Sequence, residues 1–432
     1  MQKPSNQATT LSRRSFMKAS ASAAVSAAAL AGMNRAYAAG SDRLRLGLIG
    51  CGGRGHHDGG KFLTAGQNVD LVAMGDMFGD RLAATRKGLQ ASFAQQVKVT
   101  DETCFTGFDA YKKVLAAGVD VVILTAPPHF RPEHLRAAVE AGVHVFMEKP
   151  VAVDPVGIRS VIESGELADR KGVTLVAGTQ MRRINHLVEG VKRLRDGALG
   201  DILGGQCVRI GDGMLGWGPK PRQAAWSDME WQLRRWLFVT WLSGDFIAEM
   251  HVHNLDLLNW VMGSPPEKVL AMGGRQVRTG PEYGDVYDHV TAEYEYPNGV
   301  RIEYMGSQID GVSFRNDLNF AGTKGTVYMD FANCIIKGAS PWKYDGPQND
   351  PCIQQHADQI DAILNGKKLN EARQIAESSL TAIMGRMSAY TGRALKWDWA
   401  LKASKLDLRP EKYELGPLPM PPVAMPGKTP LL

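Results

Sequence analysis

Residues 44–55 read LRLGLIGCGGRG, an apolar run of strand-forming composition that leads directly into a glycine-rich turn. The three glycines of the GxGxxG pattern stand where a strand would end and a helix would begin. The first permits a tight turn, the second lets the backbone approach a pyrophosphate, and the third allows helix and strand to pack closely. The pattern predicts a dinucleotide-binding turn, whose expected cofactor-binding residues are Gly50, Gly52, Gly53, Arg54 and Gly55.

A second apolar run, residues 69–75, ends in Asp76, 21 residues after Gly55. A carboxylate at this position accepts hydrogen bonds from the ribose hydroxyls and repels a 2′-phosphate. Met77 offers no cation to such a phosphate, but Arg81 lies one turn further along, where we expect it to contact the cofactor. We therefore expect NAD as the cofactor, with NADP as the less favoured alternative.

Strands and helices then alternate up to residue 178. Short apolar runs separated by stretches of helical length are typical of a parallel sheet covered on both faces. The predicted elements are a strand at Val119–Thr125, a helix at Pro132–Ala141, a strand at Val143–Met147, a helix at Val156–Arg170 and a strand at Val173–Ala177. Residues 42–178 are therefore expected to form a doubly wound α/β domain of the Rossmann type, with its ligand at the carboxyl ends of the strands.

The next part of the chain, residues 179–408, has the pattern of an α+β domain. Alternating runs at Val290–Tyr296 and Val300–Tyr304, separated by a Pro-Asn-Gly turn, predict hairpins in a mainly antiparallel open sheet. Helices are expected at Ile184–Asp196 and Ile353–Leu364.

Residues 409–432 form a tail that contains seven of the chain's 22 prolines. This composition favours an extended chain without regular structure. The tail either wraps a neighbouring subunit or is a loose end, and both interpretations stay open.

The first 38 residues have the three parts of an export signal. The twin-arginine pattern SRRSFMK at residues 12–18 precedes an apolar stretch of small residues and an Ala-Tyr-Ala cleavage pattern at residues 36–38. We expect a twin-arginine (Tat) signal cut after Ala38 and a periplasmic protein. Resemblance to other Tat substrates implies export in the folded state, with the cofactor already loaded.

The same 38 residues contain the whole excess of positive charge. They hold five of the 50 Lys and Arg residues and no acidic residue, so the remainder carries 45 basic and 45 acidic residues. This neutrality argues against a nucleic-acid partner, and no apolar run reaches the roughly 18 residues of a membrane span. The five cysteines include no CxxC pair, which argues against a disulfide framework and a structural zinc site.

Further motifs complete a pattern that is typical of a known family. The TAPP motif at residues 125–128 follows one predicted strand, and the EKP motif at residues 148–150 follows the next. Residues 243–256 form a segment that ends with a carboxylate-x-x-x-His pair, and residues 369–370 and 380–392 match C-terminal helices. Together with the glycine turn, these stretches resemble the glucose–fructose oxidoreductase / inositol dehydrogenase (Gfo/Idh/MocA) family over nearly the whole chain after the signal.

The resemblance implies roles for the residues at the matched positions. Lys149 would bind the reacting hydroxyl near the nicotinamide, and the peptide bond before the following proline is often cis. Glu249 and His253 replace the family's Asp-x-x-x-His pair, and Arg131 stands where the family has a histidine, so a local contact differs here. The further cofactor-binding residues that the resemblance implies are Thr125, Pro127, Glu148 and Lys149 itself.

The predicted catalytic residues are Lys149, Glu249 and His253. Oxidising a secondary alcohol requires a hydride acceptor on one face and a base for the hydroxyl proton. An imidazole, with its ordinary pKa of about 6.5, is a suitable base at neutral pH, and Lys149 could share or relay the proton. Glu249 lies four residues before His253, on the same face if the segment is helical, and could orient the ring.

His251 is a candidate substrate-binding residue that we expect to line the pocket. With His253, Glu249 and Asp256 it also resembles a metal-ligand cluster. No other ligand spacing supports zinc, so we expect no metal.

Two further regions hold substrate-binding candidates. One directly follows the last predicted strand of the first domain, and the other precedes the histidine segment at residues 243–256. Arg182 or its neighbour Arg183 could bind substrate hydroxyls or a carboxylate, while the other pairs within the domain interface. Trp236 belongs to a group of five of the nine tryptophans within residues 217–241. Their flat faces suit a sugar ring, although each could instead fill a core or a subunit interface.

The combined prediction is a periplasmic NAD-dependent enzyme that transfers hydride between the nicotinamide and a secondary hydroxyl of a sugar or glycoside. The open sheet of the family commonly mediates assembly, so we expect a homodimer or homotetramer. Because an exported protein lacks a dissociable NAD pool, we hypothesise that NAD stays bound and is recycled within the site. The alternatives are a redox-neutral glycoside hydrolase or lyase acting through a transient keto-sugar, and a non-catalytic sugar-binding protein.

Overall fold

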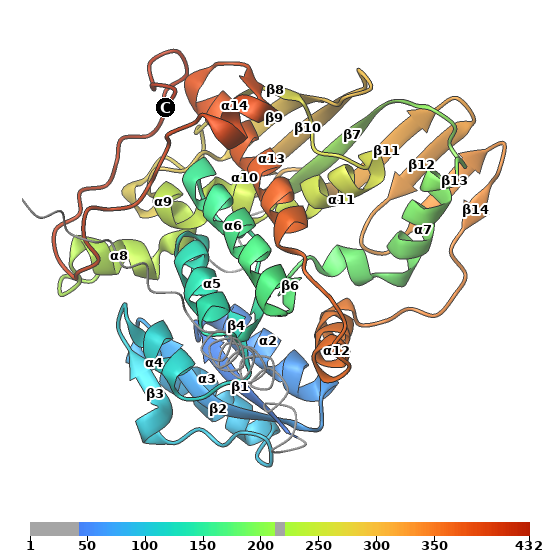
Figure 1. Ribbon diagram of the computed structural model, residues 1–432. Coiled ribbons are helices and arrows are strands. Elements are labelled where there is room, and N and C mark those ends of the chain that lie inside the picture. Colours follow the sequence, from blue (N-terminus) through green and yellow to red (C-terminus); the bar gives the residue numbers. More distant parts are fainter. Residues whose placement is uncertain (1–42, 212–220) are drawn as a thin grey trace, which may run out of the picture. The chain divides into compact units, whose positions relative to one another are not determined.

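The computed structural model describes residues 43–211 and 221–432. Its first sheet has six parallel strands in the order β3-β2-β1-β4-β5-β6 (Figure 1). The strands are β1 (Leu44–Ile49), β2 (Val69–Asp76), β3 (Cys104–Thr106), β4 (Val121–Leu124), β5 (His144–Met147) and β6 (Leu175–Ala177). Helices α2 (Gly53–Ala65), α3 (Gly79–Ser92), α4 (Ala110–Ala116), α5 (Arg131–Glu140) and α6 (Pro155–Lys171) connect them. The order reverses between β1 and β4, which is where a doubly wound sheet forms its ligand crevice.

The second sheet has nine strands in the order β14-β13-β12-β11-β7-β10-β9-β8-β15. Strand β10 runs parallel to β7 and antiparallel to β9, so the sheet is mixed but mainly antiparallel. Its strands are β7 (Ile202–Gly211), β8 (Lys268–Gly274), β9 (His289–Glu295), β10 (Arg301–Gln308), β11 (Arg315–Gly322), β12 (Gly325–Met329), β13 (Cys334–Gly338), β14 (Trp342–Lys343) and β15 (Leu395–Lys396). The predicted fold class, a Rossmann-type sheet followed by an α+β domain, is confirmed.

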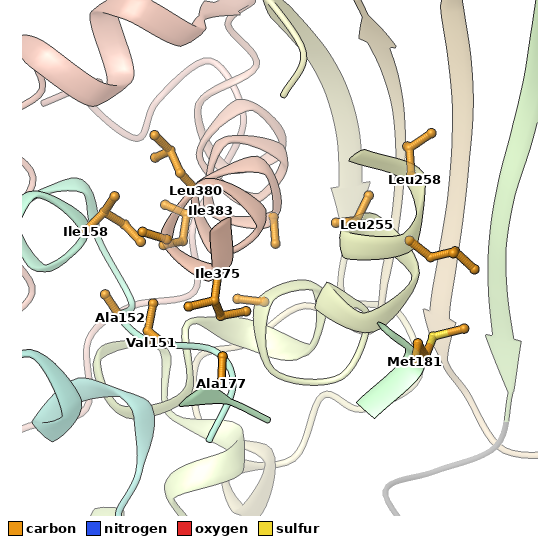
Figure 2. Close-up of a cluster of buried hydrophobic side chains, with 14 of the residues drawn as sticks. Val151, Ala152, Ile158, Ala177, Met181, Leu255, Leu258, Ile375, Leu380 and Ile383 are labelled. Atoms are coloured by element: carbon orange, nitrogen blue, oxygen red, sulfur yellow. The ribbon is translucent and has the colours of Figure 1, made fainter. Parts of the chain in front are cut away.

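The helices of the second part are α7 (Asn185–Arg195), α8 (Asp228–Arg234), α9 (Thr240–Ser243), α10 (Asp245–Glu249), α11 (Val252–Met262), α12 (Pro351–Leu364), α13 (Ala372–Thr391) and α14 (Trp397–Lys402). Of these helices, α7, α11, α13 and α14 pack against strands of this sheet, whereas α12 packs against the first domain. Helix α13 is buried along most of its length and packs against both β8 and α6 (Figure 1). Figure 2 shows Ile375, Leu380 and Ile383 of α13 in one apolar cluster with Ile158 of α6, so a single core joins the two sheets.

Most predicted elements are present with ends that differ by no more than two residues. The exception is β10, which continues to Gln308 because residues 305–308 pair with β7. Helix α12 lies in the sequence range of the second domain but packs against α2 of the first. Long-range pairing and packing decided both differences.

The tail after Leu408 has no helix or strand, as its proline content predicted. It is not a loose end, because it lies along its own chain. The backbone amide of Met229 donates to Gly416 O, the Tyr287 hydroxyl donates to Ala424 O, and the Ser404 hydroxyl donates to Leu432 O.

The predicted export signal lies outside the described residues. Within the described part, no helix is long and apolar enough to cross a membrane.

Candidate active site

The glycine turn between β1 and α2 has the geometry that a pyrophosphate requires. Gly50 adopts a φ of +96°, and a Cβ on Gly55 would lie 1.9 Å from Gly50 O, so both positions require glycine. A Cβ on Gly52 or Gly53 would meet no described heavy atom within 4 Å, so the space above the start of α2 is open. No side chain caps this helix, which leaves its first amide groups available to an anion. The turn therefore fits a dinucleotide.

Asp76 lies at the end of β2, beside this turn. Its Oδ2 accepts from the Cys51 amide at 2.6 Å and its Oδ1 accepts from the Phe78 amide at 2.8 Å. Burial raises the pKa of Asp76, while these two amides and Arg81 oppose the rise. Because each carboxylate oxygen can accept more than one hydrogen bond, the ribose hydroxyls still have acceptors here.

A small pocket opens next to Asp76. Gly50, Arg81 and Pro127 line it, together with Leu233 from α8. The sequence analysis did not predict that a residue of α8 would lie beside the cofactor site.

Thr125 and Arg131 tie together the loops that follow β4 and β5. The Thr125 hydroxyl donates to Gly50 O at 2.6 Å, which joins the β4 loop to the glycine turn. The buried Arg131 guanidinium donates to Pro150 O at 2.8 Å and also to Ala126 O. Burial lowers the pKa of Arg131 to about 10. Arg131, which replaces the family's histidine, therefore bridges the two loops.

Glu148 and Arg54 form the next layer of the site. Glu148 is 3% exposed, and its Oε1 lies 3.7 Å from Arg54 Nε. Burial raises the pKa of Glu148, and the Arg54 charge opposes this. The Glu148 carboxylate in turn raises the pKa of Arg54 more than any other group does. This pair holds the start of α2 to the EKP motif.

Lys149 is held by a carboxylate from the second part of the chain. It is 6% exposed, and its Nζ donates to Glu249 Oε1 at 3.0 Å and to Glu249 O at 2.6 Å. The Lys149–Pro150 peptide bond is cis, as the resemblance implied. The structure thus brings together two of the three predicted catalytic residues.

His253 lies at the start of α11 and is 7% exposed. Burial lowers its pKa well below 6.5, and the charges of Lys149, Arg209 and Arg54 lower it further. Within the described residues its ring nitrogens have no hydrogen-bond partner. The imidazole is therefore neutral at physiological pH and has a nitrogen able to accept a proton.

The predicted contact between Glu249 and His253 is not present. Helix α10 ends at Glu249 and α11 begins at Val252, so the four-residue spacing does not place both side chains on one helical face. Glu249 holds Lys149 instead of orienting the imidazole. The helix break between the two residues is the physical reason.

His251 does not line a pocket. It is 0% exposed, its Nδ1 lies 2.5 Å from the Tyr304 hydroxyl, and its Nε2 lies 3.2 Å from Gln308 Nε2. Both ring nitrogens are occupied inside the core, so no nitrogen remains for a substrate. No group of three His, Cys, Asp or Glu residues suited to a metal occurs in the described ranges.

Arg182 and Arg183 both form ion pairs within the chain. Arg182 binds Asp256 through two nitrogens, each at 2.9 Å, and stacks over Trp260 at 5.1 Å. Arg183 lies 2.6 Å from Glu371. The expectation that one of them stays available to substrate finds no support in these contacts.

The described tryptophans of the group at residues 217–241 pack against other side chains, whereas the sequence analysis considered them as partners of a sugar ring. Trp231 and Trp241 are buried at 8% and 6% exposure, and Trp226 stacks on Trp231. Trp236 is half-buried between two apolar clusters. Trp217 lies outside the described residues.

One of these clusters, the nucleotide-side cluster, borders the pocket beside Asp76. Its buried members are Phe78, Met229, Leu233, Val239, Trp241 and Leu242. Half-buried side chains pack around it from the Rossmann loops, from Trp236 and from the tail, namely Met77, Phe108, Phe130, Trp236, Leu408, Tyr413, Leu418 and Met420. Three distant parts of the chain therefore meet at the nucleotide end of the crevice.

Arg209, on β7, is a second site residue that the sequence analysis missed. Its Nη1 donates to Met250 O at 2.6 Å, and its charge lowers the pKa of His253. An arginine in an alternating strand gives no sequence signal of such a position.

Two family models match the chain. One, described as "Oxidoreductase family, NAD-binding Rossmann fold", matches residues 44–179, and the other, "GFO/IDH/MocA C-terminal domain", matches residues 191–328. Together they cover most of the chain.

Relatives in both sequence and structure agree with these matches. The chain is 28% identical over 214 residues to 2,7-anhydro-N-acetylneuraminate hydratase of Escherichia coli (strain K12), which covers 49% of this chain and 52% of that protein. It is 22% identical over 340 residues to inositol 2-dehydrogenase of Acidothermus cellulolyticus, which covers 78% and 86%. Among solved structures, aldose-aldose oxidoreductase from Caulobacter crescentus has a TM-score of 0.64 at 19% identity and covers 82% of this chain and 99% of that one.

Three of the curated relatives are matched over only 52%, 60% and 62% of their own length. Their names therefore do not transfer to this chain. The family models and the two sheets do identify its relationship. This chain belongs to the Gfo/Idh/MocA family of NAD-binding oxidoreductases.

Proposed function

We propose that the protein is an oxidoreductase that transfers hydride between NAD and a secondary hydroxyl of a sugar or glycoside. The observation that carries the proposal is the Lys149–Glu249 ion pair, buried beside the neutral His253 and joined through Glu148 and Arg54 to the glycine turn. A cation and an uncharged base close together are the groups that oxidation of an alcohol requires.

Each residue then has a separate task. When bound, the nicotinamide supplies the hydride acceptor. The Lys149 ammonium, held by Glu249 at 3.0 Å, donates a hydrogen bond to the reacting oxygen and stabilises its developing negative charge. The neutral His253 accepts the hydroxyl proton.

We propose NAD rather than NADP as the cofactor. Asp76 supplies the carboxylate that accepts from the ribose hydroxyls and repels a 2′-phosphate. Arg81 lines the same pocket, but its Nη2 approaches Arg234 O at 3.4 Å and its guanidinium lies over Phe78, so part of its donor capacity is directed away from a 2′-phosphate.

We further propose that NAD remains bound between reaction cycles. The nucleotide-side cluster would enclose the adenosine half of the cofactor, since Leu233 and Phe78 line both the cluster and the pocket. The Gln232 side chain donates to Leu418 O at 2.6 Å, and the Leu418 amide donates to Asp228 Oδ2 at 3.0 Å. These bonds hold the tail over α8, so release of the nucleotide would require both to move.

A bound cofactor also suits the second candidate function, a redox-neutral hydrolase, lyase or hydratase that forms a transient keto-sugar. In that reaction the hydride removed from the substrate returns before product leaves. One relative is named as a hydratase of an anhydro-sugar acid, which keeps this candidate in view.

The proposed location is the periplasm, through the twin-arginine signal at residues 12–18. Export of a folded protein is consistent with a cofactor that travels with it. Replacing Arg13 and Arg14 together by lysine should leave the protein in the cytoplasm, which fractionation with an antibody would detect.

The proposed assembly is a homodimer or homotetramer. The face of the second sheet opposite its helices exposes apolar side chains on three strands: Leu203, Leu270, Met272 and Met305. A subunit packed on this face would remove them from water. Analytical ultracentrifugation of the wild type and of Met272→Lys tests this, because a monomeric wild type would contradict it.

The function itself is tested on protein purified with its nucleotide. The nucleotide is released by heat, identified by mass spectrometry, and its reduction by sugars and glycosides is followed by absorbance. Formation of a keto-sugar with reduced cofactor supports the oxidoreductase. Cleavage or hydration without net reduction supports the redox-neutral candidate, and a protein that neither contains nor binds NAD contradicts both.

A further inference from the structure

Arg209 is a charged residue of the site whose guanidinium has hydrogen-bond donors that no described residue occupies. Its side chain is half-buried on β7. Its Nη1 donates to Met250 O at 2.6 Å and lies 3.4 Å from Asn254 Oδ1. Among the described residues, Nε and Nη2 have no hydrogen-bond partner, and neither atom is sealed from solvent. The guanidinium is therefore anchored on one side and available on the other.

The charges around Arg209 do not balance. Arg209 has no carboxylate within 4 Å in the described part of the chain, and Glu249 is the acidic group that acts most strongly on its pKa. The same Glu249 is already bound to Lys149 Nζ at 3.0 Å. Two cations thus share one carboxylate. Burial lowers the pKa of Arg209, which reflects the cost of holding its charge away from water.

The positive charge of Arg209 lies close to the proposed reacting residues. Lys149 and Arg209 are the two charges that most lower the pKa of His253 after burial itself. Lys149 Nζ also donates to Glu249 O and Arg209 Nη1 donates to Met250 O, so both cations bind the short segment that leads to the proposed base His253.

Two further cations of the site are already engaged: Arg54 is paired with Glu148 and Asp58 at 3.7 Å and 3.6 Å, and Arg131 donates to the carbonyls of Pro150 and Ala126. A neutral sugar would leave Arg209 without a countercharge.

We propose that Arg209 binds a carboxylate of the substrate, so that the preferred substrates are acidic sugars such as uronic acids. This inference rests on the proposed function, because it names the substrate class of the same site. The carboxylate accepts from Nε and Nη2 of Arg209, a planar fork that suits a carboxylate. The reacting hydroxyl lies further along the sugar, at Lys149 and His253. Arg209 is thus a specificity residue and not a catalytic one.

The preference should be large enough to measure. A charge-assisted hydrogen bond from a partly buried arginine changes affinity by about 10- to 100-fold. Since the neutral sugar leaves the same donors unpaired, an acidic sugar and its neutral counterpart should differ in kcat/KM by about that factor. The KM for the acidic sugar should also rise with salt concentration.

The experiment compares matched substrates on the NAD-containing protein. The pairs are glucuronate and glucose, galacturonate and galactose, and mannuronate and mannose. The variants are Arg209→Met, which removes the charge, and Arg209→Lys, which restores it without the fork. Arg136→Met is the control, because it removes an arginine whose partner is Glu140 on the surface of α5.

We expect at least one acidic sugar to exceed its neutral counterpart about 10-fold or more in kcat/KM. Arg209→Met should abolish this preference, because kcat/KM should fall about 10-fold or more further for the acidic sugar than for the neutral one, with the nucleotide content unchanged. Arg209→Lys should restore part of the preference, and Arg136→Met should leave it as in the wild type. Equal activity on both members of every pair overturns the proposal. So does an equal loss on both in Arg209→Met, which would assign Arg209 only to holding the Met250 carbonyl.

Calorimetric binding of the same sugars separates this inference from the proposed function. A uronate that binds through Arg209 without reducing the nucleotide would support the carboxylate site and contradict the oxidoreductase. Reduction of the nucleotide by neutral sugars, with no uronate bound, would support the oxidoreductase and overturn the carboxylate site.

Discussion

The two ends of the cofactor crevice are built on opposite physical principles. At the nucleotide end, apolar side chains such as Phe78, Leu233 and Trp241 meet from three parts of the chain. At the reacting end, buried charged groups face one another, with Lys149 held by Glu249. Apolar contact is non-directional and suits retention of a ligand, whereas fixed charges suit a reaction in which charge develops.

The comparison implies that binding and chemistry can be changed separately in this protein. Substitutions at the reacting end should change rates and leave the bound nucleotide in place. Substitutions in the nucleotide-side cluster should release the nucleotide and leave the rate per bound cofactor unchanged. The variants below are chosen to break this separation if it is wrong.

The largest effect is expected for Lys149→Met. The variant keeps the aliphatic stem but removes the ammonium that Glu249 holds, so the developing charge on the substrate oxygen loses its partner. We expect the single-turnover rate of nicotinamide reduction to fall by about 10³-fold or more, with nucleotide content unchanged. Lys368→Met, at an exposed lysine, is the control. Activity within a factor of a few of wild type would contradict the role of Lys149.

A smaller effect, on retention, is expected for Leu418→Ser in the tail. Leu418 packs around the nucleotide-side cluster, so a polar side chain there weakens the closure over α8. The dissociation rate of NAD, measured after dilution into an excess of a competing nucleotide, should rise by about 10-fold. Leu415→Ser is matched to it, because Leu415 is 51% exposed in the same tail. Equal NAD dissociation rates in the two variants would show that the tail does not contribute to NAD retention.

Glu249→Gln should have an effect of comparable or smaller size at the other end. The amide oxygen can still accept from Lys149 Nζ, but the negative charge between Lys149 and Arg209 is lost. We expect kcat to fall by about 10-fold, since charge-assisted hydrogen bonds are stronger than neutral ones. The dissociation rate of NAD should stay at the wild-type value. Faster NAD release from this variant would show that the two ends are coupled.

The smallest effect is expected from pH, through buried histidines such as His129 at the nucleotide end. Burial lowers the pKa of His129, His134 and His356 from 6.5 to about 3. The unfolded chain therefore binds more protons than the folded chain between these values, and the free energy of unfolding decreases as pH falls. Asp245 and Asp285, whose pKa burial raises from 3.8 to about 6, act in the opposite direction between those two values.

Burial lowers the pKa of His251 and His253 well below 6.5 as well, so the affected histidines outweigh Asp245 and Asp285, and the free energy of unfolding should decrease as pH falls from about 6 to about 4. Thermal unfolding across this range measures it. A melting temperature that is constant or rises on acidification would contradict the burial of neutral histidines.

The fold and the cofactor site were largely readable from sequence, because their signals are local. The glycine turn, Asp76 and the alternation of strands and helices depend on neighbours within a few residues, and the predicted elements of the first domain appear within two residues of their predicted ends. Lys149 was proposed as a site residue because its EKP motif resembles that of the Gfo/Idh/MocA family. The cis peptide bond that the resemblance implied is also present.

The hydrogen-bond partners of the site residues could not be predicted from local sequence signals. The four-residue spacing predicted a Glu249–His253 contact, but a helix break turned Glu249 toward Lys149, 100 residues away in sequence. His251 resembles a site residue in sequence and is enclosed by Tyr304 and Gln308 in the core. Spacing along a chain predicts contacts only while one regular element continues.

The sequence by itself determined that this protein has a dinucleotide turn, a Rossmann-type sheet and a lysine at the end of a neighbouring strand. Only the tertiary structure decided that Glu249 holds this lysine, that Arg209 binds the Met250 carbonyl near His253, and that α8 and the tail meet in the nucleotide-side cluster. The physical reason is the separation along the sequence over which each interaction acts. Turns and strands follow from local backbone preferences and hydrophobic periodicity, whereas charges and apolar surfaces find their partners only when distant segments pack together.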